Sequence, residues 1–279
     1  MAAPQQVEAE GPTYTRRHAT GAESARSLLF TVLGELVLRS GGRAWTSAFI
    51  DVLGRLGVEE KAARQALMRT GGDGWLRSER SGRRTVWHLT PAAETLLREG
   101  TERIFGFTAV AHEWDGAWTL VLARAPETDR RMRHLLRSRM NWAGFGNPAP
   151  GVWISPGGQR AGRAADVLAE AGVTGGQVFT ASHADGEIAQ MIDQAWDLST
   201  LAAGYDAFVD RFSGPAPRDR IARVVDLVHE WRRFPWLDPG LPAEYLPHGW
   251  SGTRAARLFA RLHGRWLEPA LDEWRGLAS

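Results

Sequence analysis

The chain has 279 residues, of which 43% are hydrophobic and 13 are Trp, so it is long enough for two or three globular domains with apolar cores. It contains no Cys, which excludes disulfide bonds, thiolate metal sites and a Cys nucleophile. The net charge is only +2, but residues 24–90 carry 11 basic and 6 acidic side chains, whereas residues 183–279 carry 11 basic and 14 acidic ones.

The beginning of the chain is polar and contains Gly and Pro, which predicts a flexible arm. Arg16, Arg17 and His18 are interpreted as parts of a solvated tail rather than as DNA contacts. Ser24 has the character of a helix N-cap, and apolar residues at helical spacing predict a first helix that ends at Gly41.

Two further helices are predicted on either side of Gly57, over residues 45–56 and 58–70. Helical spacing gives the second of them one buried face and one face in solvent. The residues expected on the buried face are Val58, Ala62, Ala63, Ala66 and Leu67. The residues expected on the outer face are Lys61, Arg64, Gln65, Met68 and Arg69.

A basic hairpin is predicted next. Residues 75–80 and 83–89 form two extended runs, and the Ser81-Gly82 pair between them favours a tight turn. Thr90 then caps a helix over residues 92–100. Helix, turn, basic helix and basic hairpin in this order indicate a winged helix-turn-helix, whose second helix suits the major groove of DNA. This favours a DNA-binding regulator over an enzyme.

The predicted DNA contacts lie on the second helix and the wing. Arg binds guanine bidentately and Gln binds adenine, so Arg64, Gln65 and Arg69 are the candidates for base readout, with a solvated polar face as the alternative. The basic residues beside the wing turn suit the DNA backbone or the minor groove. The full set is Thr46, Lys61, Arg64, Gln65, Arg69, Arg80, Arg83 and Arg84. Trp45, Trp75 and Trp87 are expected to be packing residues.

In the middle of the chain, short apolar runs alternate with helical segments. Strands are expected near residues 118–123, 144–147, 152–154 and 177–181, and helices over residues 128–142 and 163–171. This β-α-β-β-α-β order predicts a ferredoxin-like domain, for which dimerisation is the expected role.

From residue 186 onward the pattern is helical. Helices are predicted over residues 188–212, 218–233 and 253–274, with a Pro-rich stretch over residues 234–242. The chain is therefore interpreted as an α+β protein. Its expected parts are a flexible arm (1–23), a winged helix-turn-helix domain (24–100), a ferredoxin-like domain (101–182) and a helical C-terminal domain (183–279).

Sequence signatures of catalysis and metal binding are absent. The chain has no Gly-x-Ser-x-Gly elbow, no Gly-rich phosphate loop and no pair of His at i,i+4 spacing, so neither a catalytic residue, a metal nor a cofactor is expected. Neither a signal peptide nor an apolar run long enough to span a bilayer is found, and the expected location is the cytoplasm.

Several sequence blocks carry a resemblance to a known family. They are Ala25-Arg26-Ser27-Leu28-Leu29, Trp45-Thr46, Gly74-Trp75-Leu76, Pro150-Gly151-Val152-Trp153-Ile154-Ser155-Pro156, Asp238-Pro239, Leu241-Pro242, Leu246-Pro247 and Gly249-Trp250-Ser251-Gly252. On these residues the chain resembles the repressors of phenylacetate-degradation operons, the PaaX family, over nearly everything after residue 23.

The resemblance implies a winged-helix DNA reader, a middle domain similar to a CRISPR-associated nuclease, and a helical C-terminal domain. It also implies a dimeric repressor that is released from operator DNA by an aryl-CoA thioester, typically phenylacetyl-CoA. The chain departs from the family where the second helix usually continues as an Arg-Leu pair, because Arg69 is followed here by Thr70-Gly71-Gly72. The two Gly are expected to end this helix about one turn early and to alter the DNA sequence that it reads.

The effector site is expected where Arg and aromatic side chains occur together, because CoA carries phosphates and an adenine ring. Residues 229–236 supply both kinds, although Trp-rich helices more often bury their rings as core. The candidate effector residues are Arg131, Trp231, Arg232, Arg233, Trp236 and Trp250. Arg131, Arg133 and Arg137 form an alternative anion site on the exposed face of the middle helix.

Two other functions remain as alternatives. Asp115 precedes the strand at residue 118, which leaves open a metal-dependent nuclease, although the related nucleases carry their metal-binding Asp near the end of that strand. The second alternative is an adaptor or structural protein whose winged head binds another protein.

Overall fold

The computed structural model describes residues 24–107 and 114–279 of the chain. The predicted arm, with Arg16, Arg17 and His18, lies outside the described residues. The chain divides into two compact units. The head unit consists of Met1–Gly106, Pro215–Glu230 and Arg261–Ser279, and the sheet unit consists of Phe107–Gly214 and Trp231–Ala260. The predicted C-terminal domain is therefore shared between the two units.

The head unit starts with a helical segment whose geometry changes along its length. It consists of α1 (Ala25–Val32), a π-helical turn (Leu33–Val37) and a 3-10 turn (Leu38–Ser40). Ser24 caps α1 as predicted, since its hydroxyl accepts the N–H of Ser27 at 3.2 Å. The sequence does not predict the π turn, which buries Glu35 with its carboxylate 2.5 Å from Nε2 of His263.

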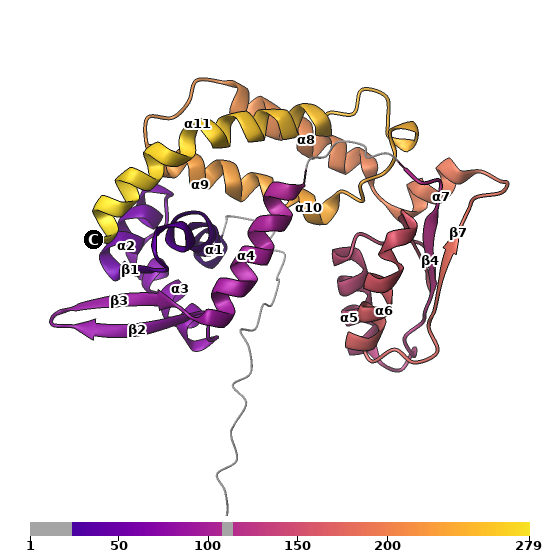
Figure 1. Cartoon of the computed structure of the whole chain (residues 1–279), viewed down its shortest axis with the longest axis horizontal. Helices are drawn as coiled ribbons and strands as arrows, with labels where there is room; N and C mark the ends of the chain where they lie inside the picture. Colours follow the sequence, from indigo (N-terminus) through magenta and orange to yellow (C-terminus); the bar gives the residue numbers. More distant parts are fainter. Residues whose placement is uncertain (1–23, 108–113) are drawn as a thin grey trace, which may run out of the picture. The chain divides into compact units, whose positions relative to one another are not determined.

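The predicted helix-turn-helix and wing are confirmed (Figure 1). The elements are β1 (Arg43–Trp45), α2 (Thr46–Arg55), α3 (Glu60–Gly72), β2 (Leu76–Ser81) and β3 (Arg84–Leu89). The strands form an antiparallel sheet in the order β1-β3-β2. The sequence does not predict β1, because three residues are too few for an alternating pattern. The wing turn consists of Gly82, with φ +59°, and Arg83, so it lies one residue later than predicted.

The next helix, α4 (Pro91–Gly106), begins where it was expected, since the Thr90 hydroxyl accepts the N–H of Ala93 at 3.2 Å. It continues past the predicted end at residue 100. Its last turn is held by Phe105, whose ring lies 4.6 Å from the ring of His263. The predicted domain boundary at residue 100 therefore falls inside a helix.

Two helices from the last third of the sequence belong largely to the head unit: α9 (Arg220–Trp231) and α11 (Gly252–Ala278). Trp274 of α11 is fully buried and packs edge-on against Phe49 of α2, with ring centroids 5.9 Å apart. The hydroxyl of Thr31 lies 2.9 Å from Nδ1 of His229 in α9. The core of the winged head is thus completed by helices distant in sequence.

An ion-pair network also joins α2 to these helices. Arg55 of α2 pairs with Glu273 of α11, with Asp219 just before α9 at 3.6 Å, and with Asp51 at 2.8 Å. The hydrogen bond to Glu273 raises the pKa of Arg55, and the nearby carboxylates of Asp51 and Asp219 act in the same direction, against the effect of burial.

The sheet unit contains the predicted ferredoxin-like arrangement. Its elements are β4 (Trp118–Leu122), α5 (Arg130–Trp142), β5 (Gly146–Ala149), β6 (Val152–Pro156), a 3-10 turn (Gly158–Arg160), α6 (Ala161–Glu170) and β7 (Gln177–Ala181). The sheet is antiparallel in the order β5-β6-β4-β7, which places the first and third strands at its centre. The predicted β-α-β-β-α-β order is confirmed.

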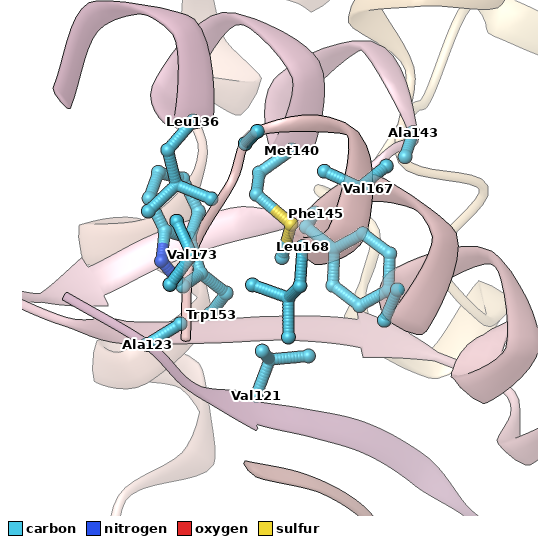
Figure 2. Close-up of a cluster of buried hydrophobic side chains, with 12 residues drawn as sticks. Val121, Ala123, Leu136, Met140, Ala143, Phe145, Trp153, Val167, Leu168 and Val173 are labelled. Carbon is cyan, nitrogen blue, oxygen red and sulfur yellow. The ribbon is translucent and has the colours of Figure 1, made fainter. Parts of the chain in front are cut away.

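The core of this unit lies between one face of the sheet and the helices α5 and α6 (Figure 2). Val121 and Trp153 point from the two central strands toward Leu136 and Met140 of α5. Of the residues predicted to face inward from α5, Leu136 and Met140 are fully buried, whereas Met132 and Leu135 lie at the edge of the cluster. The apolar spacing therefore fixes which face of α5 is turned to solvent.

The remaining helices of the sheet unit differ from the prediction, and the last of them falls in the Pro-rich stretch 234–242, where no helix was predicted. They are α7 (Ile188–Ala195), α8 (Leu198–Ser213) and α10 (Phe234–Leu237), followed by a 3-10 turn (Ala243–Tyr245). The single helix predicted over residues 188–212 is interrupted at Trp196, which is extended with φ −140°. Asp197 then starts α8, because its carboxylate accepts the N–H of Thr200 at 2.9 Å. In the described part of the chain, no helix has the length and apolar character needed to cross a membrane.

Candidate nucleic-acid interface

The side chains that α3 buries are mostly small, which lets it lie close to α1 and α2. The buried residues are Ala63, Ala66, Leu67 and Thr70. The predicted buried face is confirmed at Ala63, Ala66 and Leu67, whereas Val58 and Ala62 are only half-buried. The inner face therefore fixes the rotation of α3 about its axis and with it the identity of the outward residues.

The outer face of α3 is exposed as predicted. Lys61, Arg64, Gln65, Met68 and Arg69 are all exposed and, with Glu60, line a shallow open depression. Glu60 and Arg64 form an i,i+4 ion pair of 2.7–2.8 Å. Such exposed pairs contribute only a few tenths of a kcal/mol, so Arg64 can exchange this partner for a stronger acceptor. The face offers cations, one amide and the apolar side chain of Met68, which is 66% exposed.

The end of α3 differs from the prediction. The helix includes Gly71 and Gly72 and is capped by Asp73, so the two Gly do not end it early. Packing against the wing explains why position 71 is Gly, because a Cβ built there would lie 2.9 Å from Cζ3 of Trp87. Gly74, with φ +77°, turns the chain into β2. Gly71 thus allows close contact between α3 and the wing strand.

The three predicted wing contacts are all exposed: Arg80 on β2, Arg83 in the turn and Arg84 on β3. The guanidinium of Arg84 lies over the ring of Trp45, 5.6 Å from its centroid, which restricts its conformations. Within the described residues, no carboxylate pairs with any of these three Arg, so the wing presents uncompensated positive charge.

Thr46 lies at the first position of α2 and is half-buried. Its hydroxyl donates to the carbonyl of Thr85 at 3.1 Å and accepts the indole N–H of Trp87 at 3.0 Å. Both hydrogen bonds join α2 to the central wing strand. The structure therefore uses this hydroxyl to position the wing. Trp75 and Trp87 are buried packing residues, as expected, and Trp45 is half-buried.

The candidate effector residues do not form one open site. Trp231 is fully buried, with its ring stacked on Phe259 at 4.6 Å and tilted against Phe208 and Phe234. The core interpretation of this Trp is therefore favoured. Trp250 is half-buried and meets Tyr205, the same ring that Trp231 approaches from another side, at 5.5 Å.

Trp236 is half-buried against Trp142 at the end of α5, with ring centroids 4.7 Å apart. Arg233 is exposed over the Phe234 ring and Arg232 is half-buried. Arg131 is exposed near the start of α5, eleven residues or about 16 Å of helix from Trp142. The structure thus brings Trp236 close to α5 but leaves Arg131 at the other end of that helix.

Sequence reasoning missed a partly buried polar cluster in the sheet unit, in which Ser155 and Tyr205 are buried and Arg160 and Asp238 are half-buried. Arg160 donates to the Ser155 hydroxyl at 2.9 Å and to the Pro239 carbonyl at 3.2 Å. Asp238 accepts the Tyr205 hydroxyl at 2.7 Å and the N–H of Gly240 at 2.8 Å. The only signal for it in the sequence is the Asp238-Pro239 block, and nothing in the sequence marks Arg160.

Burial dominates the electrostatics of this cluster. It lowers the pKa of Arg160 and raises the pKa of Asp238, although the two opposite charges stabilise one another. Burial also raises the pKa of Tyr205, and the Asp238 carboxylate adds to that shift. The arrangement fastens the segment at residues 238–240 to the ferredoxin-like part of the unit.

Asp115, the residue that suggested a nuclease, is engaged by the backbone. Its carboxylate accepts the N–H of Ala117 at 3.0 Å and that of Gly158 at 3.3 Å, so it shapes the entry into β4. Across residues 24–107 and 114–279, no group of three or more His, Asp or Glu side chains is arranged to hold a metal ion.

Three family models match the chain in succession. "PaaX-like protein" matches residues 24–93, "PaaX protein central Cas2-like domain" matches residues 111–192, and "PaaX-like protein C-terminal domain" matches residues 196–276. The chain belongs to the PaaX family. The resemblance seen in the sequence blocks is therefore confirmed, and the central match agrees with the ferredoxin-like sheet unit.

Two known proteins are similar to the chain over 91% of its length. The chain is 28% identical over 273 residues to "Transcriptional repressor PaaX" of Escherichia coli (strain K12), which covers 91% of this chain and 85% of that protein. Among solved structures it is similar to "Uncharacterized protein Rv0674 from Mycobacterium tuberculosis", with 25% identity and a TM-score of 0.61 over 91% of this chain and 98% of that one.

Proposed function

We propose that this protein is a dimeric transcriptional repressor that binds operator DNA through its winged head and is released by an aryl-CoA thioester. The observation that carries the proposal is the outer face of α3, which places Lys61, Arg64, Gln65 and Arg69 in solvent on a helix of fixed rotation. The similarity to a protein named as the transcriptional repressor PaaX supports the same function.

In this proposal, α3 and the wing each contact a different part of the DNA. Arg64 and Arg69 bind guanine O6 and N7 bidentately, Gln65 binds adenine, and Lys61 near the start of α3 binds a phosphate. The wing residues Arg80, Arg83 and Arg84 contact the backbone or the minor groove. Met68 provides the apolar contact that a thymine methyl group requires.

A single winged head buries too little DNA surface for tight specific binding, so two heads are expected on a palindromic operator. Support for a dimer comes from the second face of the sheet, which is opposite α5 and α6. Leu122 on β4 and Phe179 on the edge strand β7 are 43% and 45% exposed. Leu120 lies directly opposite Phe179, so these apolar side chains share one face. A second copy of the chain is the proposed partner of this face.

The proposed effector is a CoA thioester with an aryl acyl group. An aryl ring alone contributes roughly 2–3 kcal/mol of burial, whereas micromolar binding needs about 8 kcal/mol. The phosphates and adenine of CoA supply the remainder through Arg and aromatic side chains. Trp236 and Trp250, both half-buried, and the neighbouring Arg232 and Arg233 are the proposed contacts, with Arg131 as a further candidate.

The test is a titration of the protein–promoter complex with phenylacetyl-CoA, CoA and phenylacetate, using anisotropy of a labelled duplex from the upstream region of its own gene. We expect binding to the duplex and release by the thioester only. Release by the free acid and not by the thioester would contradict the effector class. Retained self-association without binding to any promoter fragment would favour the adaptor function. Cleavage of RNA or DNA that depends on a divalent ion would favour the nuclease.

A further inference from the structure

The helix α5 of the sheet unit carries an unusual concentration of one charge. Its 13 residues include five Arg and no Asp or Glu. They are Arg130, Arg131, Arg133, Arg137 and Arg139. Leu136 and Met140 are buried against the sheet and fix the rotation of the helix (Figure 2). Four of the five Arg are exposed, so they lie on its solvent side.

The five Arg differ in their partners. Arg139 pairs with Glu170 of α6, which also lies 3.7 Å from Arg163. Arg130, Arg131, Arg133 and Arg137 are exposed, and no carboxylate among residues 24–107 and 114–279 pairs with them. Positive charge on this helix is therefore balanced on one flank only.

The uncompensated Arg are unfavourable for the helix itself. Arg133 and Arg137 are like charges at i,i+4 spacing, which destabilises a helix by a few tenths of a kcal/mol. Arg130 and Arg131 lie in the first turn, where the helix dipole disfavours cations. An anion bound from outside the chain would offset both of these unfavourable placements.

The spacing of the side chains defines the shape of that anion. Arg130, Arg133 and Arg137 form the Arg stripe: they follow i, i+3 and i+7 along one side of α5 and span about 10.5 Å. Duplex DNA carries one phosphate charge about every 1.7 Å along its axis when both strands are counted, so a row of cations of this length lies beside several phosphates. A stripe on a convex helix suits an extended polyanion better than a small ligand, which needs enclosure.

We propose that the Arg stripe is a second, sequence-independent contact with the phosphate backbone of duplex DNA. This inference rests on the proposed function, because it assumes that the protein binds duplex DNA through its winged head. It assigns the Arg stripe to DNA affinity, and it leaves the discrimination between sequences to α3.

The test compares two double variants of the full chain that remove equal charge from the same unit. One is Arg133→Gln with Arg137→Gln, and the matched control is Arg139→Gln with Arg163→Gln, which removes the two Arg that share Glu170. Binding is measured by anisotropy between 50 and 200 mM salt, on the operator and on an unrelated duplex. A third variant, Arg133→Lys with Arg137→Lys, retains the charge.

Loss of two phosphate contacts should reduce the slope of log Kobs against log salt by about 1.8, which corresponds to roughly 12-fold less salt-induced weakening over this range. The loss should be equal on both duplexes, absent in the control and largely restored by Lys. A slope equal to that of the control would overturn the proposal, as would an unchanged slope with a lost response to phenylacetyl-CoA or an altered oligomeric state. If the wild-type protein binds neither duplex, both this inference and the proposed function fail. If the wild-type protein binds the operator and the Arg133/Arg137 variant binds it with the same affinity and salt dependence, this inference fails and the proposed function stands.

Discussion

The outer face of α3 and the segment at residues 229–236 are both binding candidates on sequence grounds, but their structures differ. Both carry two Arg over a short stretch, and only the second segment is rich in aromatic residues. Every candidate on α3 is exposed, whereas Trp231 is fully buried between Phe208, Phe234 and Phe259. Long polar side chains at helical spacing therefore mark a surface reliably, because burying them without partners is costly. Aromatic rings carry no such restriction and fill cores as readily as pockets.

The strongest test of this comparison is Trp231→Ala. Removal of a fully buried ring that packs on at least five aromatic side chains should lower the free energy of unfolding by about 3–5 kcal/mol. The control is Trp236→Ala, at a half-buried ring, which should cost less stability and weaken the response to phenylacetyl-CoA. Urea unfolding and effector titration measure both. If Trp231→Ala keeps its stability and loses only the response, Trp231 is a ligand contact rather than core.

Arg69→Ala tests the other side of the comparison. Arg69 is exposed at the C-terminal end of α3, so its loss should leave stability unchanged and weaken operator binding by roughly 1–3 kcal/mol. The matched control is Arg98→Ala on α4, which removes an exposed Arg paired with Glu94. Gel-shift titrations on the operator and on an unrelated duplex distinguish base readout from general affinity. Normal operator binding by Arg69→Ala would remove this part of α3 from the interface.

The two neighbouring Gly at the end of α3 test how closely this helix packs on the wing. Only Gly71 has a neighbouring side chain in the space that a Cβ would occupy. Gly71→Ala places a Cβ 2.9 Å from the Trp87 ring and should destabilise the head by about 1–2 kcal/mol. Gly72→Ala meets nothing within 4 Å and should stabilise the helix by up to about 1 kcal/mol. Thermal unfolding measures both changes. Equal effects of the two substitutions would show that helix propensity, and not contact with the wing, decides the outcome.

The smallest effect is expected at Asp238. Burial raises the pKa of this carboxyl, so the folded protein holds its proton more tightly than the unfolded chain does. The ionised group therefore costs stability as the pH rises from about 4, the ordinary value for Asp, through the raised pKa. Asp238→Asn cannot ionise, so its free energy of unfolding relative to that of the native protein should increase with pH over this range. A constant difference in urea unfolding from pH 4 to 8 would contradict the shift.

The sequence predicts most of the fold because its periodic patterns are local. The order of elements, the cap at Ser24, the outer residues of α3 and the ferredoxin-like order all follow from spacing and turn residues within a few positions. What the sequence does not predict depends on distant partners. Gly71 was expected to end a helix, but its neighbour is Trp87, 16 positions later. Arg160 gains its role only because Pro239 and Asp238 are folded against it.

The head unit is built from three separate stretches of the chain, and this affects how it folds during synthesis. The partners of Phe49, Arg55 and Glu35 are Trp274, Glu273 and His263, all of them on α11. At about 5–20 residues per second, a ribosome needs roughly 10–30 s after completing α4 before these residues are made. During that interval the nascent head must keep an apolar surface without its final cover. The winged head, although encoded early in the chain, is therefore expected to be among the last parts to finish folding.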